Sequence, residues 1–172
     1  QYYGKEKEVV TGIVQRLNGK NVSINLGKAD AVLSENEQVK NENFQPTDRI
    51  KVYILEVKDT PKGPRIQVSR THPGLVKRLF EAEVAEVRDG TVEIKSIARE
   101  PGSRTKIAVW SNDPDVDPVG ACVGLNGARV GAVVNELRGE KIDIITWDEN
   151  PALLIENALS PAKAIAVMAD PD

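Results

Sequence analysis

The chain has 172 residues, of which 40% are hydrophobic and 28% are charged, a balance that supports packed domains and argues against global disorder. Aromatic residues make up only 4%, so the core must be mainly aliphatic and stacking platforms for bases are few. The formal net charge of −3 argues weakly against a phosphate-binding protein when the chain is taken as a whole.

The charge is unevenly distributed along the chain. Residues 1–70 contain 12 Lys and Arg against 9 Asp and Glu, whereas residues 71–149 contain 10 against 14. Any long-range attraction to RNA is therefore expected mostly from the first part. The single cysteine, Cys122, excludes an internal disulfide and fits a reducing compartment. There is no apolar run of membrane-spanning length and no signal peptide, and the only methionine is Met168, so we expect a piece of a longer protein.

The first part of the chain has the pattern of a small β-barrel. Asn18–Gly19 is typical of a two-residue hairpin turn, because both central positions of such a turn need a positive φ. Around Leu55 the alternation of apolar residues goes off register, which predicts either a β-bulge or a strand that coils with the barrel. The expected strands span residues 8–14, 21–26, 28–33, 50–57 and 65–69. Five short strands separated by turns indicate a closed barrel of the OB type.

From His72 onward the apolar period becomes helical. Pro73 suits a first helical turn, and Asp89–Gly90 ends the predicted helix. Alternating residues then predict strands over 91–98 and 104–110, two helices over 119–123 and 128–137, and a strand over 140–147. The order is α-β-β-α-α-β. Residues 150–172 predict a helix and then a strand, as if a second copy of this unit began there.

The motif with the clearest chemistry lies between the two predicted short helices. Gly124-Leu125-Asn126-Gly127 has two glycines three apart, and without Cβ atoms such a turn lets another backbone approach its N–H groups. A GxxG alone is weak evidence, since the glycines could simply shape a helical hairpin. Within the order α-β-β-α-GxxG-α-β it indicates a KH domain, whose GxxG loop clamps the backbone of about four nucleotides.

Several longer runs carry a more specific resemblance. They are residues 69–73, 94–109, 117–124, 135–137, 140–144 and 157–163. In these runs the chain resembles the NusA family of bacterial transcription factors, and the likeness covers almost the whole chain. It implies an α+β multidomain fold: a five-stranded OB-fold barrel of the S1 type at 1–71, a type II KH domain at 72–149, and the truncated start of a second KH domain at 150–172.

The resemblance also implies a function. Members of this family are cytoplasmic factors that modulate transcriptional pausing, termination and antitermination while contacting nascent single-stranded RNA. RNA polymerase would be contacted through an N-terminal domain that this chain lacks, and antitermination proteins are further expected partners. We expect an RNA-binding fragment with no enzymatic activity, no cofactor and no membrane association. The alternative is a protein-interaction scaffold that docks antitermination or ribosomal proteins through its acidic second part.

One departure from the family affects the predicted RNA site. Relatives usually carry a basic residue inside the GxxG, whereas Leu125 and Asn126 are both neutral. Phosphate contact would then rest on backbone N–H groups and on Arg129, with weaker clamping and a smaller salt dependence. Arg104 and Lys106 lie in a matching segment, and their strand face could meet either RNA or solvent.

Candidates in the barrel follow from the usual OB binding face, which is formed by strands two and three and the loops at the rim. They are Arg16, Lys20, Lys28, Lys51, Tyr53 and Arg65. Each could equally be a solvated surface residue, and Tyr53 could stack on a base or pack on the barrel.

Two other patterns are rejected from the sequence. Asp113, Asp115 and Asp117 imitate the start of a calcium loop, but Pro118 and Gly124 stand where that loop needs Gly and Glu, so we expect a polar turn and no metal site. Cys122 with the lone His72 imitates a nucleophile and its base, but the apolar neighbours of Cys122 indicate a buried thiol.

Overall fold

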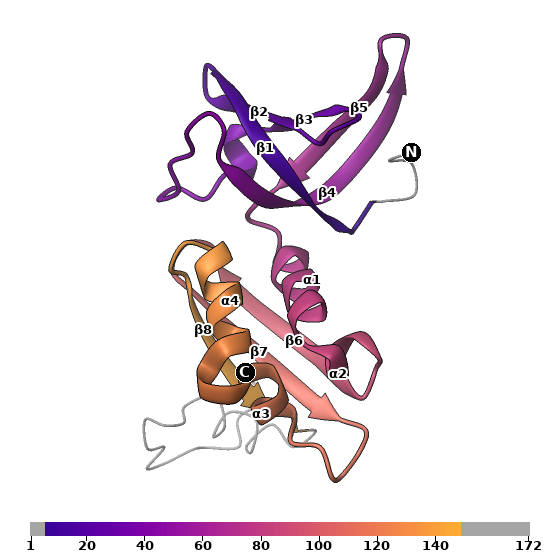
Figure 1. Ribbon diagram of the computed structural model, residues 1–172, viewed down its shortest axis with the longest axis vertical. Helices are drawn as coiled ribbons and strands as arrows, with labels where there is room; N and C mark the ends of the chain where they lie inside the picture. Colours follow the sequence, from indigo (N-terminus) through magenta and orange to yellow (C-terminus); the bar gives the residue numbers. More distant parts are fainter. Residues whose placement is uncertain (1–5, 149–172) are drawn as a thin grey trace, which may run out of the picture. The chain divides into compact units, whose positions relative to one another are not determined.

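The computed structural model describes residues 6–148, which form two compact units. Among these residues, the first unit comprises 6–79 with the short segment 136–139, and the second comprises 80–135 and 140–148. Each unit is described by itself (Figure 1). The predicted second KH copy at residues 150–172 lies outside the described residues. No helix between residues 6 and 148 has both the length and the apolar character needed to cross a bilayer.

The first unit contains a closed five-stranded barrel with the order β1-β2-β3-β5-β4. Its strands are β1 (Val9–Asn18), β2 (Asn21–Asn25), β3 (Asp30–Leu33), β4 (Arg49–Thr60) and β5 (Gly63–Ser69). The β1–β2 hairpin turns at Asn18–Gly19 as predicted, and Gly19 has a φ of +63°. The pairing of β3 with β5 is parallel and closes the barrel, whereas the other pairings are antiparallel.

The barrel core is mainly aliphatic, as the low aromatic content predicts. One cluster of buried residues fills it, comprising Val14, Val22, Ile24, Ala31, Leu33, Phe44, Ile50, Val52, Ile54, Ile66 and Val68. Of the two alternatives near Leu55, the bulge is confirmed, because the register of β4 against β5 shifts between Ile54 and Glu56. This extra residue explains why the apolar alternation of β4 is out of phase beyond Ile54.

A long connection between β3 and β4 is held by a buried ion pair to Arg70, the residue that directly follows β5. It contains one 3-10 turn, η1 (Glu35–Glu37). The Arg70 side chain is fully buried and donates to both carboxylate oxygens of Glu42, with Nε–Oε1 at 3.1 Å and Nη2–Oε2 at 2.7 Å. Its Nη1 also donates to the backbone oxygen of Lys51, so the guanidinium is satisfied despite its burial.

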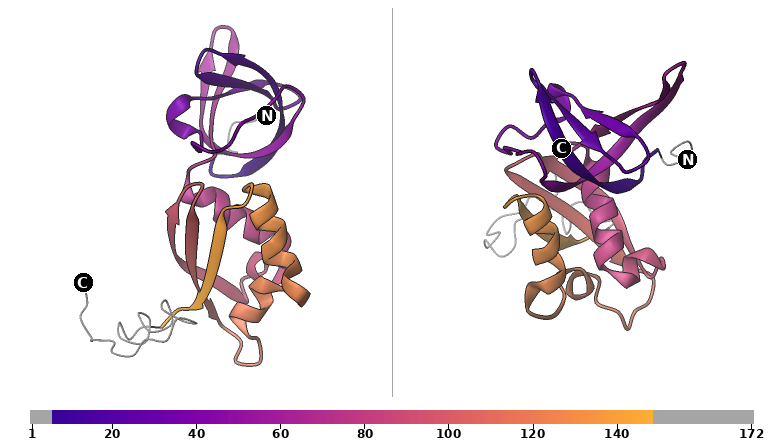
Figure 2. Two further views of the ribbon diagram at one scale, coloured as in Figure 1. Left: turned by 90° about the vertical axis from the view of Figure 1, so that its left-hand side faces the viewer. Right: turned by 45° about the horizontal axis from the view of Figure 1, so that its top comes forward.

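The second unit is built on a three-stranded sheet with the order β6-β7-β8. The strands are β6 (Val92–Glu100), β7 (Arg104–Ser111) and β8 (Lys141–Thr146), with β6–β7 antiparallel and β7–β8 parallel. The helices within residues 6–148 are α1 (Pro73–Glu83), α2 (Ala85–Arg88), α3 (Pro118–Val123) and α4 (Ala128–Glu136), and the 3-10 turn η2 (Leu125–Gly127) joins the last two. Helices α3 and α4 lie over one face of the sheet (Figure 2).

The order of elements agrees with the prediction, but the first helix differs in one respect. The spacing of apolar residues predicted one helix up to Asp89–Gly90, whereas the structure breaks it at Val84, which is extended with φ −115° and ψ 107°. Val84 is fully buried, and its N–H still bonds the carbonyl of Phe80 at 2.8 Å. The extended residue turns the chain into the short helix α2.

Candidate nucleic-acid interface

The GxxG segment forms a compact turn between α3 and α4. Three of its residues have positive φ: Gly124 at +79°, Asn126 at +54° and Gly127 at +75°. The N–H of Gly127 bonds the carbonyl of Gly124 at 3.1 Å and closes the turn. The Leu125 side chain is 86% exposed. Within the described part of the chain, no hydrogen bond engages the backbone N–H groups of Leu125 and Asn126. These two donors are available to a ligand oxygen.

The helix that precedes the turn is fixed at its start. Asp117 caps α3, since its Oδ1 accepts from the N–H of Val119 at 3.1 Å, and Pro118 follows at the first helical position. Asp113 similarly accepts from the N–H of Asp115. The polar segment expected from the sequence therefore acts as a run of local turns that leads into α3.

The two glycines of the turn meet different surroundings. A Cβ added at Gly124 would lie 2.7 Å from Cγ and 2.9 Å from both Cβ and the backbone N of Arg129. A Cβ added at Gly127 would meet nothing within 4 Å. Gly124 is therefore required by close packing and by its φ, whereas Gly127 is required by its φ alone.

Arg129 is bonded within the second unit. Its Nη1 donates to the carbonyl of Ala121 at 2.8 Å and to Oε1 of Glu86 at 3.0 Å. Cys122, next to that carbonyl, is fully buried. Burial raises the pKa of the Cys122 thiol to about 11, although the nearby Arg129 guanidinium acts in the opposite direction. The buried-thiol interpretation of Cys122 is confirmed.

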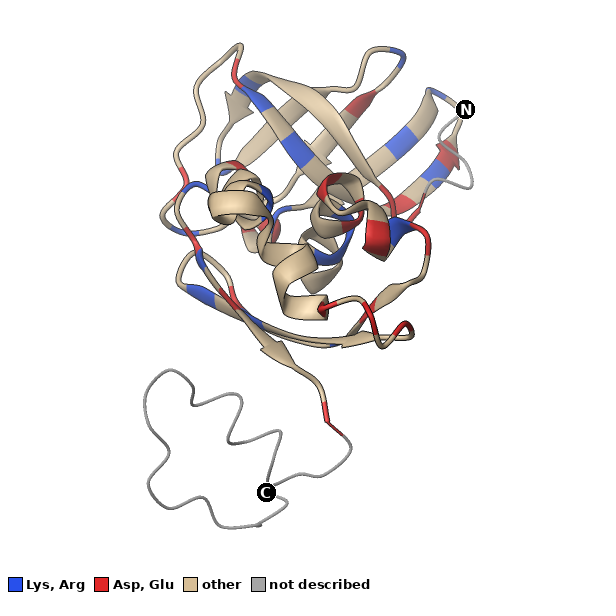
Figure 3. Cartoon of the chain, turned by 60° about the horizontal axis from the view of Figure 1, so that its bottom comes forward, with Lys and Arg blue, Asp and Glu red and all other residues tan. Residues whose placement is uncertain are grey.

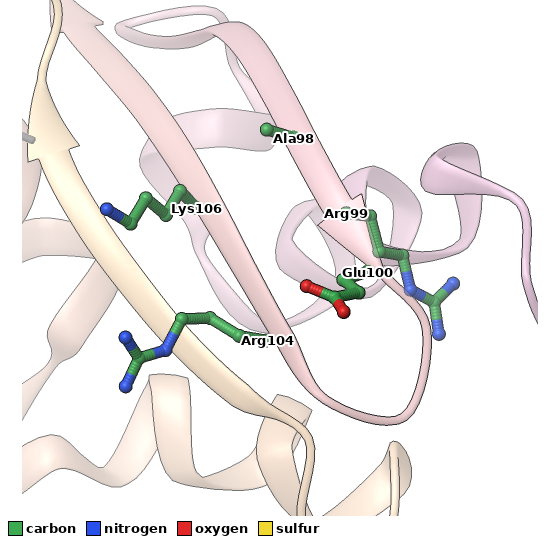
Figure 4. Close-up of a pocket in the computed structure, with 5 residues that line it drawn as sticks. All are labelled: Ala98, Arg99, Glu100, Arg104 and Lys106. Atoms are coloured by element: carbon green, nitrogen blue, oxygen red, sulfur yellow. The ribbon is translucent and has the colours of Figure 1, made fainter.

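Arg104 and Lys106 lie on a different face from the turn. Along β7 the buried Thr105, Ile107 and Val109 alternate with these two residues, so Arg104 and Lys106 point away from the face that α3 and α4 cover. Both line a shallow pocket of about 290 Å³ together with Ala98, Arg99 and Glu100 (Figure 4). Arg104 also forms an exposed ion pair with Asp143 at 3.4 Å.

The barrel candidates do not form one patch. Arg16 and Lys20 lie at the β1–β2 hairpin, and Lys20 pairs with Glu35 at 3.5 Å. Lys28 lies beyond the other end of β2, and Arg65, on β5, lines a pocket of about 450 Å³ with Asp30 and residues 60–64. That pocket also includes Lys62, a basic residue that was not among the barrel candidates because no motif in the sequence singles it out.

Two barrel candidates are partly or largely covered. Lys51 is half-buried on β4. Tyr53 is only 7% exposed, and its ring stacks on His72 with centroids 4.4 Å apart and planes 9° apart. Gly74 lies against the same ring, since a Cβ there would be 2.6 Å from Tyr53 Cε1. Of the two roles considered for Tyr53, this geometry fits packing and leaves little ring surface for a base.

The site has few charges close to the turn. Between Pro118 and Asn135 the only charged residue is Arg129. Helices α3 and α4 are accordingly drawn almost entirely in tan in Figure 3, where charged residues are blue or red. Glu86, the partner of Arg129, was not singled out from the sequence, because it is 43 residues away and belongs to no motif.

A closed five-stranded barrel and an α-β-β-α-α-β unit with a GxxG turn define an α+β chain of the OB–KH class. This is the fold class predicted from the sequence. Comparison with known families gives the particular kind of each part: a model of the S1 RNA binding domain matches residues 4–69, and one of the NusA-like first KH domain matches residues 70–147. The chain therefore belongs to the NusA family, and the resemblance found in the sequence is confirmed.

Curated relatives agree along nearly the whole chain. The transcription termination/antitermination protein NusA of Bacillus subtilis (strain 168) is 58% identical over 98% of this chain, and that of Halalkalibacterium halodurans is 55% identical over 96%. NusA of Thermus thermophilus is 47% identical over 100% of this chain. The chain spans only 45%, 44% and 45% of these three relatives.

Proposed function

We propose that this chain binds single-stranded nascent RNA, and that the Gly124–Gly127 turn is its main contact with the RNA backbone. The observation that carries the proposal is the pair of unbonded N–H groups at Leu125 and Asn126, set in a turn whose glycines leave the backbone uncovered. Backbone N–H groups of this kind bind phosphate oxygens without a side-chain charge.

The neutral turn has a consequence for the strength of binding. Leu125 and Asn126 add no positive charge, so few counterions are released when the turn meets a phosphate. Binding at the turn therefore depends less on salt than binding by basic loops. The exposed Leu125 adds an apolar contact surface for a base or a ribose.

The wider role that we propose is supported by family membership. The chain acts within a cytoplasmic factor that modulates pausing, termination and antitermination, has a binding rather than a catalytic role, and meets RNA polymerase through a domain outside this chain. Support comes from the matched S1 and NusA-like KH domains and from the names of the relatives. We further propose a domain boundary after residue 71, and a second KH domain that begins at residue 150.

The test is fluorescence anisotropy of a labelled single-stranded RNA of about ten nucleotides, long enough for the four-nucleotide KH clamp and a neighbouring contact. The chain is titrated at two salt concentrations beside the double variant Leu125→Asp/Asn126→Asp. The matched control is Ala82→Asp/Asn135→Asp, which adds the same two charges at exposed positions of the second unit.

Binding that is lost in the turn variant and kept in the control supports the proposal. Binding that survives in the turn variant moves the main site to the barrel. Absence of binding at both salt concentrations contradicts the proposal and favours the alternative of a scaffold for antitermination or ribosomal proteins.

A further inference from the structure

Arg129 is placed to act on the turn through its neighbours. It is the one charged residue between Pro118 and Asn135. Its Nη1 bonds the carbonyl of Ala121, one of the last carbonyls of α3, which the helix itself leaves without a partner. The same nitrogen bonds Glu86, which holds the guanidinium from α2.

The stem of Arg129 supports the turn directly. The Cβ and Cγ of Arg129 occupy the space that a side chain on Gly124 would need, so the backbone at Gly124 packs against the aliphatic part of the Arg129 side chain. One residue thus contacts both the end of α3 and the first glycine of the turn. Displacing Arg129 would remove a hydrogen bond from α3 and a packing surface from Gly124 together.

The pairing with Glu86 also limits what Arg129 offers to a phosphate. A carboxylate 3.0 Å away largely cancels the guanidinium charge at longer range. The two bonds of Nη1 go to Glu86 and to the Ala121 carbonyl, so a phosphate could reach the guanidinium only through Nε or Nη2.

We propose that Arg129 is a positioning residue, which together with Glu86 holds the Gly124–Gly127 turn in its RNA-binding conformation, and that it is not a phosphate ligand. The inference rests on the proposed RNA site and revises the sequence-based expectation that Arg129 contacts phosphate.

The two roles predict opposite results for Glu86→Gln. If Arg129 positions the turn, loss of Glu86 loosens the guanidinium and weakens RNA binding. If Arg129 binds phosphate, loss of Glu86 removes a competing anion, and RNA binding stays equal or becomes tighter. Charge alone cannot produce weaker binding on removal of an acidic residue, because RNA is an anion.

The RNA experiment measures affinity over a series of salt concentrations for Arg129→Met, Arg129→Lys and Glu86→Gln. The controls Lys77→Gln and Glu83→Gln remove one exposed charge of each sign. We expect all three test variants to bind about three- to tenfold more weakly, as for the loss of one hydrogen bond, with the salt slope of the native chain. A salt slope smaller by about 0.7 in Arg129→Met, rescue by Arg129→Lys, and unimpaired binding by Glu86→Gln would overturn the proposal.

A second measurement needs no RNA and separates this inference from the proposed function. Hydrogen exchange of residues 124–128 and alkylation of the buried Cys122 both report opening of the α3–turn–α4 region. We expect both to be several-fold faster in Arg129→Met and Glu86→Gln than in the two controls. Unchanged exchange and alkylation would exclude the positioning role, whether or not the native chain binds RNA.

Discussion

Gly124 and Gly127 have similar φ values but different surroundings, so the same substitution should have different costs. Gly127→Ala introduces backbone strain of about 1–2 kcal/mol. Gly124→Ala adds a contact of 2.9 Å with the backbone N of Arg129 to the same strain, and we expect it to cost about 2–4 kcal/mol. Urea unfolding of the two variants measures the difference. Equal losses of unfolding free energy would show that the turn does not rest on Arg129.

The Cys122 thiol gives a prediction for alkaline pH. Its pKa is about 11 in the folded chain against an ordinary value of 9.0. Between these values the unfolded state releases a proton that the folded state keeps, so the unfolding free energy falls as pH rises. We expect the native chain to lose up to about 2 kcal/mol relative to Cys122→Ala between pH 9 and 11. Parallel stability curves for the two proteins would contradict a fully buried thiol.

The residues of the GxxG turn could be predicted from the sequence, whereas the side-chain contacts made by other candidate residues could not. The GxxG residues are contiguous, and both glycines adopt the positive φ that the motif requires. The pairs Arg129–Glu86 and Tyr53–His72 join residues far apart in the chain, and no local pattern specifies them. An aromatic or basic residue on a strand looks the same in the sequence whether its side chain meets solvent or another part of the fold.

At the scale of elements, a buried carboxylate joins β8 to the β6–β7 hairpin. Glu140 accepts from Arg99 Nε at 3.0 Å and Nη2 at 2.9 Å, from the Gly102 N–H at 2.8 Å and from Thr105 Oγ1 at 2.5 Å. The side chains of Arg99 and Glu140 are both 1% exposed. Burial alone would raise the pKa of the Glu140 carboxyl, but these hydrogen bonds outweigh it and the pKa is lowered.

We expect Glu140→Gln to cost about 3 kcal/mol, because it leaves the Arg99 guanidinium buried without a counter-charge. The contribution should be present above the ordinary carboxyl pKa of 4.5 and lost as pH falls through the lower folded-state value, since the unfolded state then binds more protons. Unfolding of the native chain and the variant from pH 7 to pH 3 checks this. A gap in stability that widens with acid would contradict the lowered pKa.

Element type was easier to predict than element interruption. The strands, their turns and the bulge of β4 follow from alternation and from Gly, Asn and Pro positions. The break at Val84 does not, because Val87 keeps the helical spacing and no Gly or Pro marks the site. Burial of Val84 in the second unit accompanies its extended conformation, and such a tertiary preference leaves no local signal.

At the scale of the whole molecule, the excess of positive charge in residues 1–70 predicts that the barrel supplies most of the salt-dependent part of RNA binding. Lys20 is already paired with Glu35, so we expect Lys28→Gln/Arg65→Gln to weaken binding of a 20-nucleotide RNA more than Arg16→Gln/Lys20→Gln. The salt slope should fall by about 0.7 for each phosphate that a variant no longer neutralises. If the two double variants weaken RNA binding equally, the barrel attracts RNA through its overall electrostatic field and not through a defined binding surface.

The most direct test of the central claim, that RNA meets the chain at the Gly124–Gly127 turn, is an NMR titration of the isotope-labelled chain with single-stranded RNA of about ten nucleotides. The amide signals of Leu125 and Asn126 should shift first and most, because their N–H groups would gain phosphate partners. Large shifts confined to the barrel, with the signals of residues 124–128 unchanged, would contradict the account.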